Sequence, residues 1–245
     1  TAANNTGIGY FALKANTTGT ANVALGANSL DACTTGFNNV GVGTNALGAV
    51  TTGNMNTAVG NNCADAITTG LSNVAIGQSA LGATTTGDNN TAIGTSALQE
   101  NTTASDNTGI GRSALLANTT GSDNTAIGRL ALLSNTTGSG NTALGFKAGD
   151  NITTGDNNIV IGNDVDASSA TVDNEITLGN SSVATLRCNV QTISSLSDAR
   201  DKTNVIDLPE GLGFINKLRP VKFEWATRDG NGKDGSFEHG FIAQD

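Results

Sequence analysis

The chain has 245 residues and a formal net charge of −9, with one Trp, one Tyr and seven Phe. This length can hold two domains, but the aromatic content is low, and clustered Lys and Arg with aromatics, which binding to nucleic acid would require, are absent from most of the chain. No apolar run is long enough to span a bilayer, so membrane insertion is not expected.

A short pattern, Asn-(Thr/Val/Ile)-small-(Ile/Leu/Val)-Gly, recurs with a constant spacing of 17 residues. It begins at Asn5, Asn22, Asn39, Asn56, Asn73, Asn90, Asn107, Asn124, Asn141 and Asn158, and a degenerate copy begins at Glu175. A constant repeat length is typical of a solenoid, because each coil must stay in register with its neighbours. Since Thr1 lies inside a repeat, we interpret the sequence as a fragment.

Each repeat reads as one β-coil. Its second and fourth residues are β-branched or aliphatic, as in Thr125 and Ile127, and the third is mostly Ala or Gly, which is the period of two of a strand. The Gly in fifth place predicts a bend with positive φ or a close backbone approach, and Thr-Thr-Gly, altered once at Ala104, predicts a second corner. We therefore predict an all-β fold in which residues 1–180 form a parallel β-solenoid, roughly 50 Å long at a strand spacing of about 4.8 Å.

The core of such a coil is expected to be thin, because much of its length is Asn, Thr, Ala and Gly. We expect the aliphatic residues in fourth place, from Ile8 to Ile161, to form one buried column, and the small residues in third place to face the other way. A second chain could then approach the small residues closely. One thin core buries little surface by itself, so we predict a homo-oligomer, and of the possible forms a parallel homotrimer. Aligned Asn and Thr columns would add side-chain ladders between coils.

Neither a metal nor a cofactor is expected. The three cysteines, Cys33, Cys63 and Cys188, lack metal-ligand spacing, and the first two occupy small or apolar repeat positions. Small buried side chains are the simplest interpretation. The Gly-x-Gly pairs belong to the repeat and are not followed by the helix pattern of a phosphate-binding loop, and His239 stands alone.

The character of the chain changes near residue 190. Residues 1–196 contain 17 charged side chains and residues 197–245 contain 16, together with both prolines and the only Trp. We interpret residues 181–196 as a β connector that closes the rod and residues 197–245 as the truncated beginning of another, mixed α/β domain. In it, PEGLGFINKL (209–218) predicts a short helix, and VKFEW (221–225) alternates as a strand.

At this boundary stands Ser-Asp-Ala-Arg-Asp-Lys (197–202), followed by LRPVKFEW and, further on, HGFIAQD. These segments, in this order, resemble the start of the intramolecular chaperone of endosialidases and of other phage tail spikes and fibres. The resemblance covers residues 197–245 only. In that family the domain helps three chains to assemble and is then released by self-cleavage just before the Ser. The repeats resemble those of phage tail fibres and, more loosely, the heads of trimeric autotransporter adhesins.

By this resemblance, Ser197 would attack the carbonyl carbon of Leu196, with Lys202 as the base. A Ser hydroxyl is a poor nucleophile until a base takes its proton, and burial can lower the pKa of a Lys enough for it to do so. No external substrate is expected for such an enzyme. The structural alternative is that Ser197 and Asp198 cap a turn while Lys202 is solvated.

Three classes of function remain open. The first is the shaft of a phage tail fibre in a virion, with a host cell-surface receptor, such as a glycan, bound through other parts of the fibre. The second is a bacterial surface adhesin or an extracellular filament subunit. The third, an ice-binding solenoid, is disfavoured, because adjacent Thr residues of a strand point to opposite faces and would not form a paired Thr array.

Overall fold

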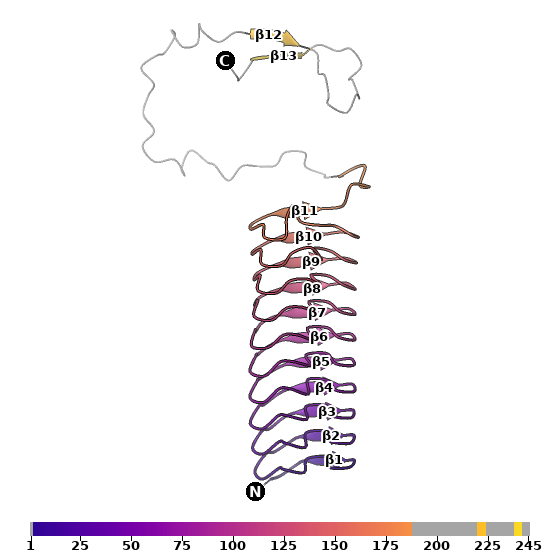
Figure 1. Cartoon of the computed structure of the whole chain (residues 1–245), viewed down its shortest axis with the longest axis vertical. Coiled ribbons are helices and arrows are strands. Elements are labelled where there is room, and N and C mark those ends of the chain that lie inside the picture. Colours follow the sequence, from indigo (N-terminus) through magenta and orange to yellow (C-terminus); the bar gives the residue numbers. More distant parts are fainter. Residues whose placement is uncertain (1, 188–219, 224–237, 242–245) are drawn as a thin grey trace, which may run out of the picture. The chain divides into compact units, whose positions relative to one another are not determined.

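The computed structural model describes residues 2–187, 220–223 and 238–241. The chain divides into two compact units, Thr1–Leu186 and Arg187–Asp245. The first unit is a stack of coils that each contribute one three-residue strand, and the described part of the second unit is a pair of strands (Figure 1). No helix occurs among the described residues.

The strands of the first unit form one parallel sheet in sequence order. They are β1 (Thr6–Ile8), β2 (Val23–Leu25), β3 (Val40–Val42), β4 (Thr57–Val59), β5 (Val74–Ile76), β6 (Thr91–Ile93), β7 (Thr108–Ile110), β8 (Thr125–Ile127), β9 (Thr142–Leu144), β10 (Ile159–Ile161) and β11 (Ile176–Leu178). Each strand residue pairs with the residue 17 places further on, as Thr108 does with Thr125. The predicted all-β parallel solenoid with 17-residue coils is confirmed.

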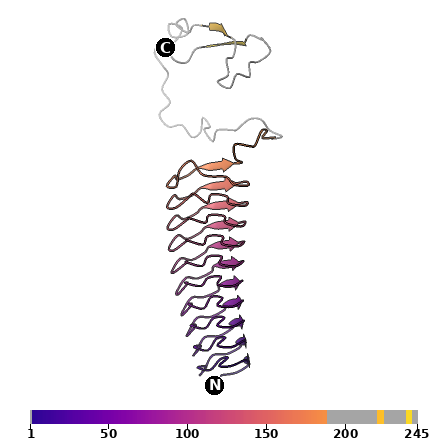
Figure 2. The same cartoon turned by 45° about the vertical axis from the view of Figure 1, so that its right-hand side comes forward.

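The strands lie one above another in a single column (Figure 2). The first residue of each strand from β1 to β10 donates its backbone N–H to the next coil. The Gly that follows each strand from β2 to β11 donates its backbone N–H to the preceding coil. In the eighth coil, Thr125 N–H donates to Asn141 O at 2.8 Å and Gly128 N–H donates to Ile110 O at 2.8 Å. Equal coil length keeps these bonds aligned throughout, which is why no insertion interrupts the repeat.

The predicted buried column was wrong. The small residue in the middle of the strand faces the interior of its own chain, and Ala58, Ala92 and Ala126 are completely buried. The aliphatic residue in fourth place points out of the coil, so that Ile76 is 40% exposed and Leu144 is 47% exposed. The two faces of the strand are therefore assigned the opposite way from our expectation, and the small residues are not available to another chain.

The reason lies in the width of the coil. The opposite wall supplies a large side chain, the Leu of the Ala-Leu block, and Leu47, Leu98 and Leu115 are completely buried. A 17-residue coil has room for that Leu only if the strand contributes a small residue. These leucines adopt left-handed backbone angles, with φ of 52° at Leu98 and at Leu115. This conformation costs roughly 1–2 kcal/mol for a residue with a Cβ, and burial of the Leu side chain offsets it.

The Asn that begins each repeat forms a buried ladder along the solenoid. Asn124 donates from its backbone N–H to Asn107 Oδ1 at 3.0 Å, and from its side-chain Nδ2 to Asn107 Oδ1 at 3.1 Å and to Gly138 O at 2.8 Å. Asn124 Oδ1 in turn accepts from the backbone N–H of Asn141 at 2.9 Å. Every donor and acceptor of this amide is used, so a buried polar group is retained without an unsatisfied atom. The predicted Asn ladder is confirmed.

A second, shorter ladder crosses three coils. Asn118 Nδ2 donates to Asn101 Oδ1 at 3.0 Å, and Asn135 Nδ2 donates to Asn118 Oδ1 at 2.9 Å. In the following coil the same position is Ile152, which has no side-chain donor. Asn135 Oδ1 is consequently buried without a hydrogen-bond partner. Such a ladder continues only where the neighbouring side chain can take part, as Thr84 Oγ1 does by accepting from Asn101 Nδ2 at 3.2 Å.

The Gly in fifth place closes each strand with a bend that no other residue can make. Gly94, Gly111 and Gly128 have φ of 134°, 132° and 143°. A Cβ on Gly128 would lie within the van der Waals radius of the carbonyl oxygen of Gly145 in the next coil. Both properties predicted for this position, positive φ and close backbone approach, are confirmed.

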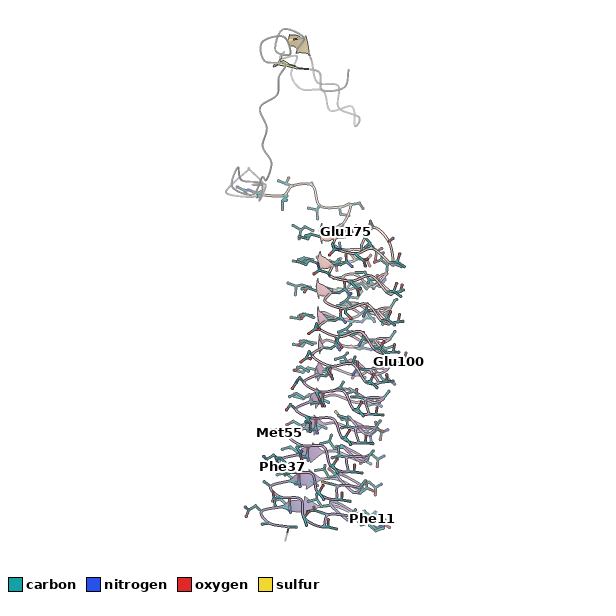
Figure 3. The ribbon with its side chains drawn as sticks, turned by 90° about the vertical axis from the view of Figure 1, so that its left-hand side faces the viewer. Phe11, Phe37, Met55, Glu100 and Glu175 are labelled. Atoms are coloured by element: carbon teal, nitrogen blue, oxygen red, sulfur yellow. The ribbon has the colours of Figure 1, made fainter. Side chains whose placement is uncertain are left out.

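The Asn ladder ends at Glu175, which takes the place of Asn in the last coil (Figure 3). Its backbone N–H still donates to Asn158 Oδ1 at 2.9 Å, but its carboxylate accepts from Ser168 N–H and from Thr177 Oγ1, each at 2.8 Å. These hydrogen bonds, first those from Ser168, hold the pKa of the Glu175 carboxyl below its usual value. Asn158 donates from Nδ2 to Val172 O and accepts at Oδ1 from Glu175 N–H, whereas the Glu175 side chain has no N–H and its Oε1 is occupied by Ser168 and Thr177, so the ladder stops there.

Cys33 and Cys63 are free thiols and completely buried. Burial raises the pKa of the Cys63 thiol to about 11, against the smaller opposing effect of hydrogen bonds from the backbone. The interpretation of these two residues as small buried side chains is confirmed. Cys188 lies outside the described residues.

Candidate functional site

The residues predicted to cut the chain, Ser197 and Lys202, and the predicted cleavage point after Leu196 lie outside the described residues. Most of the predicted β connector and the whole predicted helix over 209–218 do so too. Of the connector, residues 181–187 are described and carry no strand. These expectations therefore stay predictions.

The described part of the second unit joins two of the segments on which the resemblance rests. Strand β12 (Pro220–Phe223) comes from LRPVKFEW and strand β13 (Glu238–Phe241) from EHGFIAQD. They pair antiparallel, with Val221 opposite Gly240 and Lys222 opposite His239. The strand predicted from Val221 is confirmed as far as Phe223, and the partner strand was not predicted.

The outer face of the solenoid sheet, which we call the aliphatic face, consists of the first and third residues of strands β1 to β11, which are the second and fourth residues of each repeat. Its fourth-place column is entirely Ile, Leu or Val, and its second-place column is Thr, Val or Ile. The column remains partly accessible along its length, from Ile8 at 61% through Val59 at 37% to Leu178 at 52%. In Figure 3 these side chains project from one side of the stack, where Phe37 and Met55 also lie. A continuous apolar strip on a single chain is typical of an interaction surface.

The ends of the strands bear other exposed apolar and aromatic residues. Tyr10 and Phe11 have ring centroids 3.8 Å apart, and Lys14 Nζ lies 4.0 Å from the centre of the Phe11 ring. Further along, the Arg129 guanidinium lies 5.4 Å from the centre of the Phe146 ring. These contacts cover part of the aromatic surface but leave Phe11 and Phe146 more than one third exposed.

A polar notch of about 300 Å³ opens on another side of the coils. Gly82, Asn62, Asp65, Gln99 and Glu100 are among the residues that surround it. Burial raises the pKa of the Asp65 carboxyl. Glu100 marks this side in Figure 3, away from the aliphatic face. The notch has no aromatic side chain on which a sugar ring could stack.

Acidic residues gather near the last full coils without forming a metal site. Lys147 Nζ lies 3.8 Å from Asp150 Oδ2 and 3.6 Å from Asp164 Oδ1. Burial, and then the neighbouring Asp166 carboxyl, raise the pKa of Asp150. Within the described ranges, no group of three or more His, Cys, Asp or Glu side chains is placed to hold a metal ion. The described residues also contain no helix with the length and hydropathy needed to cross a bilayer.

Comparison with known protein families gives one result for this chain. Residues 197–245 match the family described as the chaperone of endosialidase. The match begins at Ser197 and includes β12 and β13. No curated protein and no solved structure matched the chain.

The chain thus combines a parallel β-solenoid with a later segment, residues 197–245, that matches the family described as the chaperone of endosialidase. This combination fits a tail fibre or tail spike protein. The aliphatic face was the feature that sequence reasoning missed. The alternation of Thr, Ala and Ile in each strand contained the signal, but it does not say which of the two strand faces points inward.

Proposed function

We propose that this chain is a shaft segment of a phage tail fibre, in which three copies pack in parallel through their aliphatic faces. The observation that carries the proposal is the aliphatic face itself, because it runs the whole length of the sheet and is covered by no other segment of residues 2–187. The sheet is roughly 50 Å long, and with its edges such a strip is of the order of the roughly 800 Å² per partner that stable interfaces bury.

The number three is supported by the segment that follows. The endosialidase-chaperone family, which residues 197–245 match, is associated with trimerisation. Three flat faces can enclose one apolar core about a common axis, and each chain then supplies one side of a prism. The solenoid interior and the shared core would be separate, the first filled by Leu and Ala and the second by Ile, Val, Leu and Thr.

The trimer is tested by sedimentation of the intact protein. We expect three times the chain mass for the native sequence, and loss of the trimer in Ile76→Lys, because a charged group in an apolar interface must be desolvated. Glu100→Lys is the matched control, since Glu100 is exposed and lies away from the aliphatic face. A native protein that sediments as a folded monomer at micromolar concentration would contradict the proposal, and so would an equal effect of the two substitutions.

We further propose that the shaft is released from its chaperone by cleavage between Leu196 and Ser197. The Ser197 hydroxyl would attack the Leu196 carbonyl carbon as Lys202 takes the hydroxyl proton, and the Leu196–Ser197 C–N bond would then break as Lys202 passes that proton to the departing Ser197 amine. The acyl-enzyme ester so formed would then be hydrolysed by water, which frees the Leu196 carboxylate and restores the Ser hydroxyl. The support is the position of the family match, which begins at Ser197, and the Lys five residues later.

Intact mass of the product expressed from the whole gene tests this step. We expect a mature fibre that ends at Leu196, and an uncut product from Ser197→Ala, because that variant lacks the nucleophile. Lys202→Ala should also be uncut, since the hydroxyl then keeps its proton, while Thr203→Ala should cut normally. Unchanged cleavage of Ser197→Ala would refute the mechanism and leave Ser197 and Asp198 as a turn cap. The role in a virion is tested separately, by mass spectrometry of purified phage particles.

A further inference from the structure

Four charged residues flank two neighbouring strands in the same way. Asp106 lies two residues before β7 and Arg112 two residues after it, and Asp123 and Arg129 hold the same places around β8. In the other nine coils both places are uncharged. Acid and base thus occur together in the same two coils, although few of the repeat's residues are charged.

These charges have no partner of opposite sign within the solenoid. All four side chains are exposed, and the ion pairs within residues 2–187 are those of Lys147. Asp106 Oδ1 accepts a hydrogen bond from Asn89 Nδ2 at 3.2 Å, and Arg129 lies over Phe146. Asp106 and Arg112 belong to opposite ends of one strand and are separated by roughly 20 Å of extended chain, so they cannot reach one another.

We propose that these residues form two rings of ion pairs between copies of this chain, Asp106 with Arg112 of the next copy and Asp123 with Arg129 of the next copy. The inference rests on the proposed trimer. In a ring of chains related by rotation, the contact is head-to-tail, so the end of a strand in one copy lies next to the start of a strand in its neighbour. The two sides of that contact carry the Arg and the Asp.

Closure of the ring fixes the level at which the partners meet. A slip of one coil at each contact would accumulate around three chains and prevent the ring from closing, so the partners must come from the same level. At that level β7 meets β7 and β8 meets β8, which places both arginines opposite both aspartates. The planar Arg guanidinium can donate two parallel hydrogen bonds to a carboxylate, which makes the pairing specific in geometry as well as in charge.

The function of the rings is to select register and direction. The aliphatic face repeats nearly identically every 17 residues, so apolar packing alone distinguishes poorly between one register and the next. Exposed ion pairs add little stability, but like charges placed opposite one another disfavour wrong pairings. Two charged levels near the middle of an otherwise uniform strip mark a unique alignment of three parallel chains.

Charge reversal in the 245-residue protein tests the proposal. Asp106→Arg with Asp123→Arg places Arg opposite Arg at every contact, and we expect the trimer to dissociate at a protein concentration at least about fivefold higher, as measured by sedimentation of a dilution series. Adding Arg112→Asp and Arg129→Asp restores opposite charges and should return the native value. Asp31→Arg with Glu100→Arg changes the net charge equally, away from the strand ends, and should have no such effect.

A neutral variant covers the case in which the reversed chains fail to fold. Arg112→Gln with Arg129→Gln keeps the side-chain length, and its trimer should lose the salt dependence of dissociation that the native protein shows between 0.05 and 1 M salt, roughly the range over which screening becomes complete. A native trimer that responds equally to the reversal and to the control, or a four-fold variant that is not restored, overturns the ion-pair rings and leaves the trimer standing. A monomeric native protein overturns both proposals.

Discussion

Gly128→Ala should destabilise the solenoid by about 3 kcal/mol or more, although it adds one methyl group. Gly128 has φ of 143°, which residues with a Cβ rarely adopt. Its added Cβ would also overlap the carbonyl oxygen of Gly145, a backbone atom that cannot rotate away. Relief would require β8 and β9 to separate, with loss of the hydrogen bond from Gly145 N–H to Ile127 O at 2.9 Å.

The measurement is urea unfolding followed by circular dichroism at a fixed protein concentration. Gly48→Ala is the matched control, because a Cβ there meets its nearest atom, Asn45 O, at an ordinary 3.4 Å and the backbone is not in the left-handed region. We expect its stability to stay within about 0.5 kcal/mol of the native value. Equal midpoints for the two variants would mean that the coils can move apart freely, in contradiction to the stacked register.

Asn124→Asp should cost about 3 kcal/mol at neutral pH while changing hardly any volume. The new carboxylate would keep the acceptor for Asn141 N–H but lose the Nδ2 donor to Gly138 O and Asn107 Oδ1. A negative charge would then be buried against two oxygen atoms. Burial and these neighbours should raise the pKa of the carboxyl above the value of about 3.9 that it has in the unfolded chain.

The stability of the Asn124→Asp variant should fall as pH rises. With its pKa raised by folding, the carboxyl binds its proton more tightly in the folded state, so the folded variant loses stability as pH rises from about 4 through the raised pKa. The loss relative to the native protein should therefore be smallest in acid. Asn61→Asp introduces the same charge at an exposed side chain and should show no such dependence. Parallel pH profiles for the two variants would exclude a buried Asn ladder.

The repeat unit made most of the fold predictable. Constant spacing from Asn5 to Asn158 predicts stacked coils, and the invariant Gly in fifth place predicts the bend that Gly128 makes. The orientation of the strands was not predictable from alternation, because a strand with Ala on one face and Ile on the other can be inserted either way. Leu98 decides it by filling the interior from the opposite wall, in a left-handed conformation that sequence preference disfavours.

The candidate site was predictable in a different way. Ser197 and Lys202 came from a motif, and the family match to residues 197–245 supports the resemblance without testing their chemistry. The pairing of β12 with β13 joins two segments that are separated by residues 224–237, and no short turn pattern in the sequence predicts it. The charged residues Asp106 and Arg112 can be recognised as flanking opposite ends of one strand only when the bounds of β7 are known.

The termination of the Asn ladder at Glu175 has a consequence for how such a solenoid can evolve. In every coil from Asn22 to Asn158 the Asn of this ladder donates to the coil before it and accepts from the coil after it, so removal or duplication of a coil leaves each Asn of this ladder with a matching partner. Unequal recombination between near-identical repeats in the gene would therefore change the length of the solenoid in steps of one strand spacing, roughly 4.8 Å. Glu175 and the segment after it would be inherited unchanged. The length of the solenoid could therefore vary among descendants while the Asn ladder still ends at the same residue.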